Sequence, residues 1–371
     1  MMKWLFLVIV TVAMPLSTFA QEPIERTPDQ FSIGVVEHIV STNEADPLFA
    51  STQRQVITIN RDGEIIQAEY ADNQETAADD LHLGEKVVVL QTEAFVGETR
   101  YIVIDKYRLP AVTWLLALFF LSAVIFAGRK GITSVLGLAA SLAVLLSYTV
   151  PSIIAGHSPF FVATVSAFVI AFLSITIAHG FTRQTGIALV STLVSLVLSL
   201  GLAHLFVLGA KLFGLGTEDA YTLSLAGLGG IDLRGLLLAG IVIGVLGVLD
   251  DVTTTQTATI QQIARVSRQS FSQLFKAGMS VGREHIVSLV NTLALAYVGA
   301  SLPLLLLFSF NESQTPYWVL LNGQMIMEEV IRTLVGSTAL ILAVPISTIF
   351  AAWFYSRYPS WVHEGIVEQH H

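Results

Sequence analysis

The chain has 371 residues, of which 53% are hydrophobic and only 13% are charged, and it contains no cysteine. Soluble domains carry roughly 25% charged residues, so this composition excludes an ordinary soluble protein and predicts an α-helical polytopic membrane protein. The lack of cysteine excludes a disulfide framework and a cysteine metal site. The net charge of −9 is uneven, because residues 21–109 hold 17 acidic and 7 basic side chains. An acidic segment of this kind makes nucleic acid a poor partner.

Residues 1–20 have the pattern of a signal peptide. Lys3 precedes an apolar run, and small residues close the segment at Ala20. An uncleaved N-terminal anchor is the alternative. In both cases we expect the segment that follows, residues 21–109, to lie outside the cytoplasm.

Residues 21–109 are expected to form a small β-rich domain. Two alternating runs, 55–60 and 64–70, flank Asp62-Gly63, and Asp-Gly between alternating runs predicts a hairpin. Several short strands in so short a segment favour a small open barrel or a sandwich. The acidic run 72–80 is predicted to be a mobile, solvated loop. The remaining strands are predicted at 31–40, 85–91 and 100–105.

Long apolar runs begin after Pro110 and define a transmembrane domain at 110–357, which a cytoplasmic tail follows at 358–371. A spanning helix needs about 20 mostly apolar residues. Two further pieces, 212–228 and 316–327, are too short or too polar and are expected to be re-entrant or interfacial. The runs that meet the requirement predict about seven transmembrane helices, at 111–127, 132–150, 160–178, 186–208, 233–251, 286–310 and 330–355.

Lysine and arginine are distributed unequally between the two sides of this arrangement. Lys211 and Arg234 fall on one side, which is also the side of the β domain. Positively charged loops face the cytoplasm. We therefore expect the N-terminal domain to be extracytoplasmic and the C-terminus cytoplasmic. The basic residues on the cytoplasmic side are Arg129, Lys130, Arg183, Arg265, Arg268, Lys276, Arg283 and Arg357.

The most informative segment is 244–263, where a glycine-containing apolar helix continues into a polar stripe. Asp250 and Asp251 end the apolar part and are expected about one turn inside the inner membrane boundary. A carboxylate at such a depth costs several kcal/mol and usually marks a function. The alternative is a helix that leaves the bilayer at Asp250 and is simply solvated. The spacing 4-3-4 places four side chains on one helix face: Asp250, Thr254, Thr257 and Gln261.

Two smaller clusters carry further site candidates. Arg283 and Glu284 precede the sixth predicted span, and Asn291 follows Glu284 by seven residues on the same face. An ordinary ion pair near the membrane surface, and a helix–helix contact through Asn291, are the alternatives to a functional role. Glu329 and Arg332 begin the last span and are three residues apart, so they can pair within one helix. A purely structural pair is the alternative there.

Three ordered blocks resemble the YibE/F-like family of bacterial multi-pass membrane proteins. They are Gly244-Val-Leu-Gly-Val-Leu-Asp-Asp-Val252, Val281-Gly-Arg-Glu-His-Ile286 followed by the run from Asn291 to Pro303, and Glu329-Val-Ile-Arg-Thr-Leu-Val-Gly-Ser337. Asp251 matches the family's aspartate, whereas Asp250 stands where a hydrophobic residue is usual. Glu284 stands where an aspartate is common. The resemblance implies a multi-pass protein of the bacterial inner membrane, and it does not supply a reaction.

Together these features predict a secondary transporter or permease for a small ion or solute, with Asp251 as the proton- or cation-coupling carboxylate. Arg283 and Glu284 would gate or neutralise the inner mouth, and Glu329 and Arg332 would act near the outer side. The alternative is a non-transporting scaffold or sensor whose extracytoplasmic β domain binds a protein partner.

Enzymatic activity is not expected from this sequence. It contains no P-loop, no GxSxG elbow and no HExxH motif, so we expect neither catalysis nor a cofactor. Carboxylates bind hard cations, so the sequence leaves open whether the protein has a metal site. We expect the lipid bilayer to surround the protein. The sequence leaves open whether the chain forms a homo-oligomer.

Overall fold

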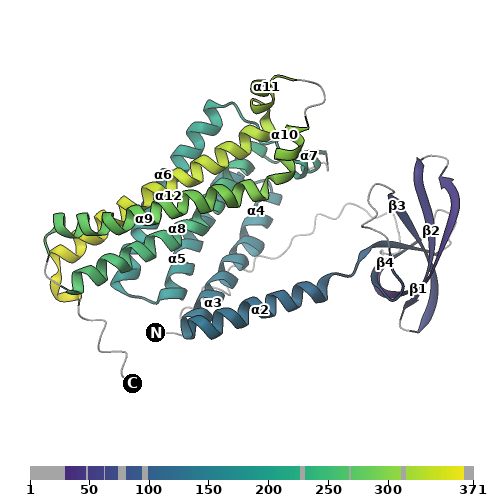
Figure 1. Ribbon diagram of the computed structural model, residues 1–371, viewed down its shortest axis with the longest axis horizontal. Helices are drawn as coiled ribbons and strands as arrows, with labels where there is room; N and C mark the ends of the chain where they lie inside the picture. Colours follow the sequence, from purple (N-terminus) through teal and green to yellow (C-terminus); the bar gives the residue numbers. More distant parts are fainter. Residues whose placement is uncertain are drawn as a thin grey trace. The chain divides into compact units, whose positions relative to one another are not determined.

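The computed structural model describes residues 30–46, 49–61, 63–73, 81–93, 99–225, 230–266, 269–310 and 315–362. The chain divides into two compact units, one ending at Ser122 and the other beginning at Ala123 (Figure 1). Each unit has a hydrophobic core of its own. The predicted signal segment, most of the predicted loop 72–80 and residues 363–371 lie outside the described residues.

The first unit contains a closed five-stranded barrel with the strand order β1-β2-β3-β5-β4. Neighbouring strands are antiparallel except β3 and β5, which pair in parallel and close the barrel, where the sequence predicted an open barrel or a sandwich. The strands are β1 Gln30–Asp46, β2 Phe49–Arg61, β3 Glu64–Asn73, β4 Lys86–Glu93 and β5 Thr99–Lys106.

The predicted hairpin at Asp62-Gly63 is confirmed. Arg61 pairs with Glu64 across it, and Gly63 has a φ of +95°, a backbone conformation that glycine adopts without steric cost. The Gly63 N–H donates to Asn60 Oδ1 at 2.9 Å. The alternation that predicted these strands also builds the barrel core, in which Ile57 and Ile59 are fully buried.

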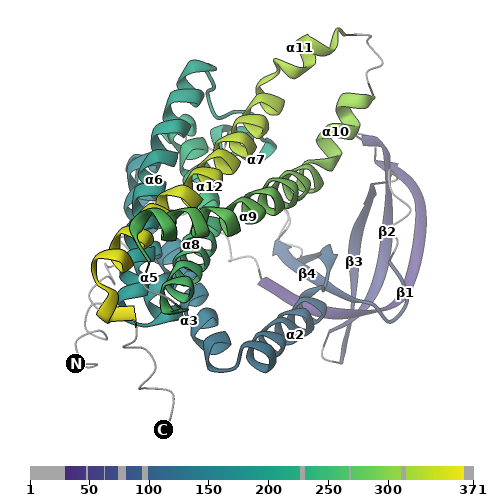
Figure 2. The ribbon, with the colours of Figure 1, turned by 60° about the vertical axis from the view of Figure 1, so that its left-hand side comes forward.

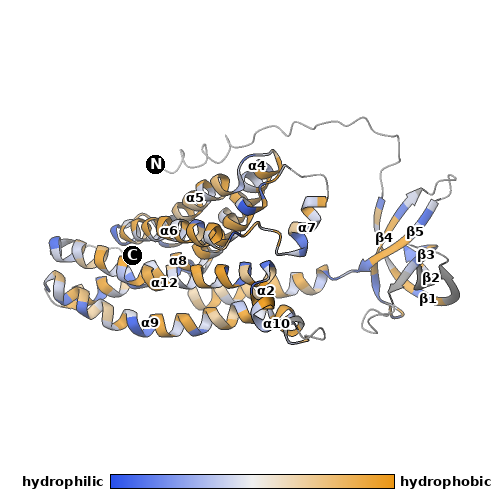
Figure 3. Cartoon of the chain, turned by 90° about the horizontal axis from the view of Figure 1, so that it is seen from above, coloured by the Kyte–Doolittle hydropathy of each residue, from blue (hydrophilic) through white to orange (hydrophobic). Residues whose placement is uncertain are grey.

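The described chain from Leu109 onward is helical, and apolar residues dominate its long helices (Figure 3). Six helical stretches in the described part of the chain are long and apolar enough to cross a membrane, and they correspond to six of the seven predicted spans. The elements are α2 Leu109–Ala127, α3 Arg129–Val144, the π-helical turn η1 Leu145–Thr149, α4 Val150–Ile154, α5 Pro159–His179, α6 Arg183–Gly209, α7 Glu218–Leu225, α8 Leu233–Val266, α9 Phe271–Ala300, α10 Leu302–Ser309, α11 Tyr317–Leu321, α12 Gln324–Arg357 and the 3₁₀ turn η2 Pro359–Val362.

The remaining predicted span, 286–310, is divided between α9 and α10. Helix α9 ends at Ala300, and Pro303, which has no N–H to donate, lies in the first turn of α10. Helix α9 also begins earlier than predicted and includes Lys276, Arg283 and Glu284. These charges keep α9 below the apolarity of the other long helices.

Helix α8 packs against α5, α6, α9 and α12 (Figure 2). Helices α5 and α8 run parallel, because Pro159 lies beside Gly235 and Ser174 beside Asp250. Helices α8 and α12 also run parallel, since Val245 approaches Gly336 and Gln256 bonds Thr348.

Helix α9 returns in the opposite direction along α12. Gly278 lies near Thr348, and Gly336 lies near Tyr297, so residue numbers rise on one helix as they fall on the other. The approach is close, because a Cβ on Gly282 would stand 2.5 Å from Val344 Cγ1. By contrast, a Cβ on Gly299 would meet no atom within 4 Å.

Candidate functional site

Asp250 lies on the side of α8 that faces α5. The Ser174 hydroxyl of α5 donates a hydrogen bond to Asp250 Oδ2. The other oxygen, Oδ1, is buried and has no hydrogen-bond partner among the described residues. In the same part of the chain, no lysine, arginine or histidine forms an ion pair with Asp250. A half-buried carboxylate is thus held by one neutral hydroxyl.

Asp251 lies in a different environment, because successive residues of a helix point about 100° apart. Its side chain is exposed, and its nearest recorded partner is the Thr255 hydroxyl, 3.5 Å from Oδ1. The charged groups of Asp251 and Lys130 both lie close enough to His179, the last residue of α5, to interact with it electrostatically. Asp251 therefore faces outward at the end of the bundle where α5 ends.

The polar continuation of α8 is buried inside the helical unit. At these positions α8 is packed against neighbouring helices and is not surrounded by solvent. The Thr254 hydroxyl is buried and donates to the Asp250 carbonyl at 2.7 Å. The Thr257 hydroxyl is fully buried without a partner in the described residues, and Gln261 is half-buried.

Two further contacts tie this part of α8 to its other neighbours. The hydroxyls of Thr192 on α6 and Thr253 on α8 are 2.6 Å apart, and both residues are fully buried. Gln256 is 1% exposed, and its Nε2 donates to the Gly278 carbonyl of α9 at 2.9 Å and to Thr348 Oγ1 of α12 at 2.8 Å.

We refer to Asp250–Thr257 as the polar segment of α8. Its side chains form hydrogen bonds with α5, α6, α9 and α12, the α-helices described above as packing against α8. The residues that form these bonds span about 9 Å of helix rise. Hydrogen bonds between membrane helices both hold helices together and line polar paths.

Arg283, Glu284 and Asn291 do not join this cluster. All three are exposed on α9, whose buried face is formed by Leu274, Gly278 and Gly282. Within the described residues Arg283 and Glu284 form no ion pair. The structure therefore does not gather Asp251, Glu284 and Asn291 in one buried site.

Glu329 and Arg332 lie together at the start of α12. Arg332 Nε is 3.7 Å from Glu329 Oε2, a distance that suits an ion pair and is too long for a hydrogen bond. The neighbouring Glu328 is 3% exposed, although the sequence assigned it no role. Its environment differs from that of Asp250, because backbone N–H groups surround it.

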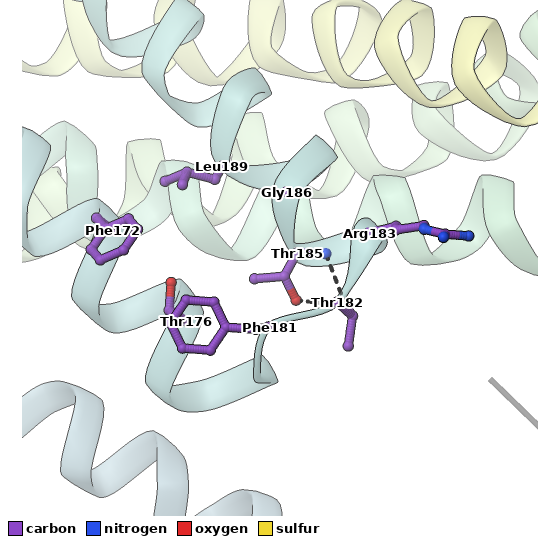
Figure 4. A pocket seen from close by; sticks show the side chains of 8 residues that line it. All are labelled: Phe172, Thr176, Phe181, Thr182, Arg183, Thr185, Gly186 and Leu189. Carbon is purple, nitrogen blue, oxygen red and sulfur yellow. Dashed lines mark hydrogen bonds between the residues drawn. The ribbon is translucent and has the colours of Figure 1, made fainter. Parts of the chain in front are cut away.

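An open groove of about 290 Å³ lies where α5 turns into α6 (Figure 4). Its walls are mostly apolar, with Phe172, Phe181 and Leu189 around the hydroxyls of the turn. Thr182 caps α6 by accepting a hydrogen bond from the Thr185 N–H at 3.1 Å. Asp250 does not line this groove, and no carboxylate does, so we do not include the groove in the site.

Sequence reasoning missed Ser174, Thr192, Gln256 and Thr348. Ser174, Thr192 and Thr348 have no charged residue close to them in sequence, and lone hydroxyls are common in membrane helices. Gln256 follows the two aspartates but lies on another face of α8 from the stripe that the 4-3-4 spacing marked. One signal was present: Gly278 and Gly282, four residues apart, predict a close helix contact that a buried polar side chain can cross. Among the described residues, no three histidines or carboxylates lie together as a metal site.

Residues 115–357 match the family model described as YibE/F-like protein. The chain belongs to the YibE/F-like family. The matched range covers the polar segment of α8 and the whole of α9 and α12. With its apolar helices, this YibE/F-like chain is an integral, multi-pass membrane protein. No curated protein and no solved structure gives a match.

Proposed function

We propose that this YibE/F-like protein is a secondary transporter or permease for a small ion or solute, and that Asp250 is its coupling carboxylate. The observation that carries the proposal is the half-buried Asp250 with one oxygen free of hydrogen bonds among the described residues. Burying such a group between membrane helices is costly, so it usually serves a substrate, an ion or a proton.

The geometry favours Asp250 over Asp251 for this role. The Asp250 carboxylate faces α5 and accepts a hydrogen bond from the Ser174 hydroxyl, whereas Asp251 is exposed at the end of the bundle. An ion that reaches Asp250 therefore meets oxygen atoms from two helices. We assign Asp251 a secondary role, in which its charge attracts cations toward the same end.

The proposal includes seven membrane passes in the bacterial inner membrane, with the barrel extracytoplasmic and the C-terminus cytoplasmic. The parallel direction of α8 and α12 supports seven passes, because the chain between two parallel spans must return across the membrane. Helix α9, antiparallel to α12, provides that return despite its charges.

A flux assay with purified protein in liposomes tests the function. The vesicles contain a pH-sensitive dye, and gradients of H⁺, Na⁺, K⁺, Mg²⁺ or phosphate are applied in turn. We expect at least one probe to move, Asp250→Asn to reduce its flux at least tenfold, and Asp251→Asn to reduce it far less.

Folding of both variants is checked by size-exclusion chromatography and thermal unfolding in detergent. If no probe moves through the parent protein, the permease proposal fails. If both variants lose flux equally while folded, the assignment to Asp250 is wrong.

A scaffold is the second candidate, and a specific observation supports it. The polar segment of α8 forms direct hydrogen bonds with neighbouring helices of the same chain, as expected of contacts that only hold helices together. In a scaffold, the acidic barrel would bind an extracytoplasmic protein. Asp250→Asn would then lower the unfolding temperature, and the parent protein would move no probe.

A further inference from the structure

Glu328 is a carboxylate that the proposed coupling site does not use. It lies one turn into α12, is 3% exposed and accepts three hydrogen bonds on a single oxygen. The donors to Oε1 are the backbone N–H groups of Gly214 at 3.1 Å and Gly216 at 3.2 Å, and Gln324 Nε2 at 2.8 Å. Two of these donors belong to the loop that follows α6, more than a hundred residues earlier in the chain.

The local sequence shapes this loop, residues 211–217, so that it can reach Glu328. Helix α6 ends in a reversal in which Lys211 has a φ of 55°, and the Leu212 N–H returns to the Val207 carbonyl at 3.0 Å. Gly214 has a φ of +80°, and a Cβ there would stand 2.1 Å from the Leu233 carbonyl oxygen. Only glycine fits at that position.

Helix α8 holds the same loop from its other side. Arg234 Nε donates to the Leu212 carbonyl at 2.7 Å, and its guanidinium lies 5.2 Å from the centre of the Phe213 ring. The loop thus connects the end of α6 with the starts of α8 and α12.

The loop 211–217 lies far from Asp250. Because α12 runs parallel to α8, Asp250 is level with the middle of α12, about 20 Å along the axis from Glu328. The space between them is filled by apolar side chains that include Val245, Leu246 and Val335. This end of the bundle is closed by the loop and by the apolar layer beneath it.

We propose that Glu328 and the loop 211–217 form a latch that closes the bundle at the end remote from Asp250. The latch can act as the gate of a transport path only if the proposed function is correct. Its closure of the bundle does not depend on that function. Glu328 is a positioning residue in this proposal, since it acts on the loop. A carboxylate suits the role because it accepts several N–H donors at once and releases them together when its position changes.

Cysteine labelling tests the closure without a transport assay. The chain has no cysteine, so Val335→Cys provides a single reporter in the apolar layer, at a position that is 3% exposed. A membrane-impermeant maleimide is added to vesicles of either orientation. We expect slow labelling in the parent and at least tenfold faster labelling when Glu328→Ala is added.

A second variant opens the latch from the loop side. A Cβ on Gly216 would stand 2.6 Å from Glu328 Oε2, so Gly216→Ala is expected to displace the loop and to speed labelling similarly. The matched controls are Gly209→Ala, where a Cβ meets no atom within 4 Å, and Glu329→Gln on the adjacent carboxylate. Both controls are expected to label as slowly as the parent.

The latch is wrong if folded Glu328→Ala and Gly216→Ala label no faster than their controls. If Glu328→Ala does not fold, Gly216→Ala alone decides. Fast labelling of these variants in a protein that moves no probe would support the closure and reject the permease. Transport by the parent with unchanged labelling of the variants would reject the latch alone.

Discussion

Gln256 shows how a single buried amide can connect three helices. Its Nε2 satisfies the Gly278 carbonyl and the Thr348 hydroxyl, although the residue is 1% exposed. Hydrogen bonds between membrane helices contribute about 0.6 kcal/mol each on average, so two such bonds are a modest part of the stability. The shape of the side chain adds to this, because its removal leaves a cavity.

We predict that Gln256→Ala lowers the free energy of unfolding by about 2 kcal/mol, from two lost hydrogen bonds and a cavity. Gln262→Ala is the control, because Gln262 is exposed on the same helix. Unfolding in detergent with increasing sodium dodecyl sulfate measures both. Equal midpoints for the two variants would show that the bonds of Gln256 contribute nothing.

The distinction between Asp250 and Asp251 also belongs to the residue scale, and sequence alone could not make it. Both are acidic and adjacent, and resemblance to the family pointed to Asp251. What separates them is the neighbour each one faces, and for Asp250 that neighbour is Ser174, 76 residues earlier in the chain. No local pattern encodes a contact over that distance.

The glycines of α9 determine how closely this helix approaches α12. Gly282 lies where a side chain would overlap Val344, while Gly299, on the same helix, faces open space. A methyl group at position 282 must push α9 away from α12 or distort Val344. Overpacking of this kind typically costs about 1–3 kcal/mol.

We therefore predict that Gly282→Ala destabilises the protein by about 2 kcal/mol, whereas Gly299→Ala is neutral or slightly stabilising because alanine favours helix. Thermal unfolding in detergent compares the pair. A Gly282→Ala variant that is as stable as Gly299→Ala would mean that α9 is not packed as closely as described.

Elements with a strong local signal were predictable. The hairpin at Asp62-Gly63 and the six apolar helices depend on turn residues, alternation and length, all of which are visible in a short window of sequence. The division of α9 and α10 was less visible, because the apolar run continues through Ser301 and Pro303. The burial of the polar segment of α8 could not be predicted at all, since it depends on which helices surround it.

The direction of the helices determines the topology of the whole molecule. With α8 and α12 parallel, the proposed topology has α9 cross the membrane in spite of its charges, which gives seven passes. Length and apolarity alone give six spans in the described residues. The direction of the helices adds α9, so the two criteria differ only on that helix.

Single cysteines distinguish the two counts. We predict that Ser270→Cys and Asn322→Cys, which flank the α9–α11 segment at exposed positions, are labelled from opposite faces of the membrane. Phe181→Cys, in the exposed α5–α6 turn, should share the side of Ser270→Cys, and Tyr221→Cys on α7 should share that of Asn322→Cys. Labelling of Ser270→Cys and Asn322→Cys from one face would reduce the count to six.

The contacts of Gln256 also have a consequence for biosynthesis. Its partners lie 22 and 92 residues later in the chain. At about 5–20 residues per second, the ribosome completes Thr348 roughly 5–20 s after Gln256. During that interval the Gln256 amide of α8 lacks its Thr348 partner. We therefore expect the insertion machinery to hold α8 until the last helix arrives, and a chain truncated before α12 to remain bound to it.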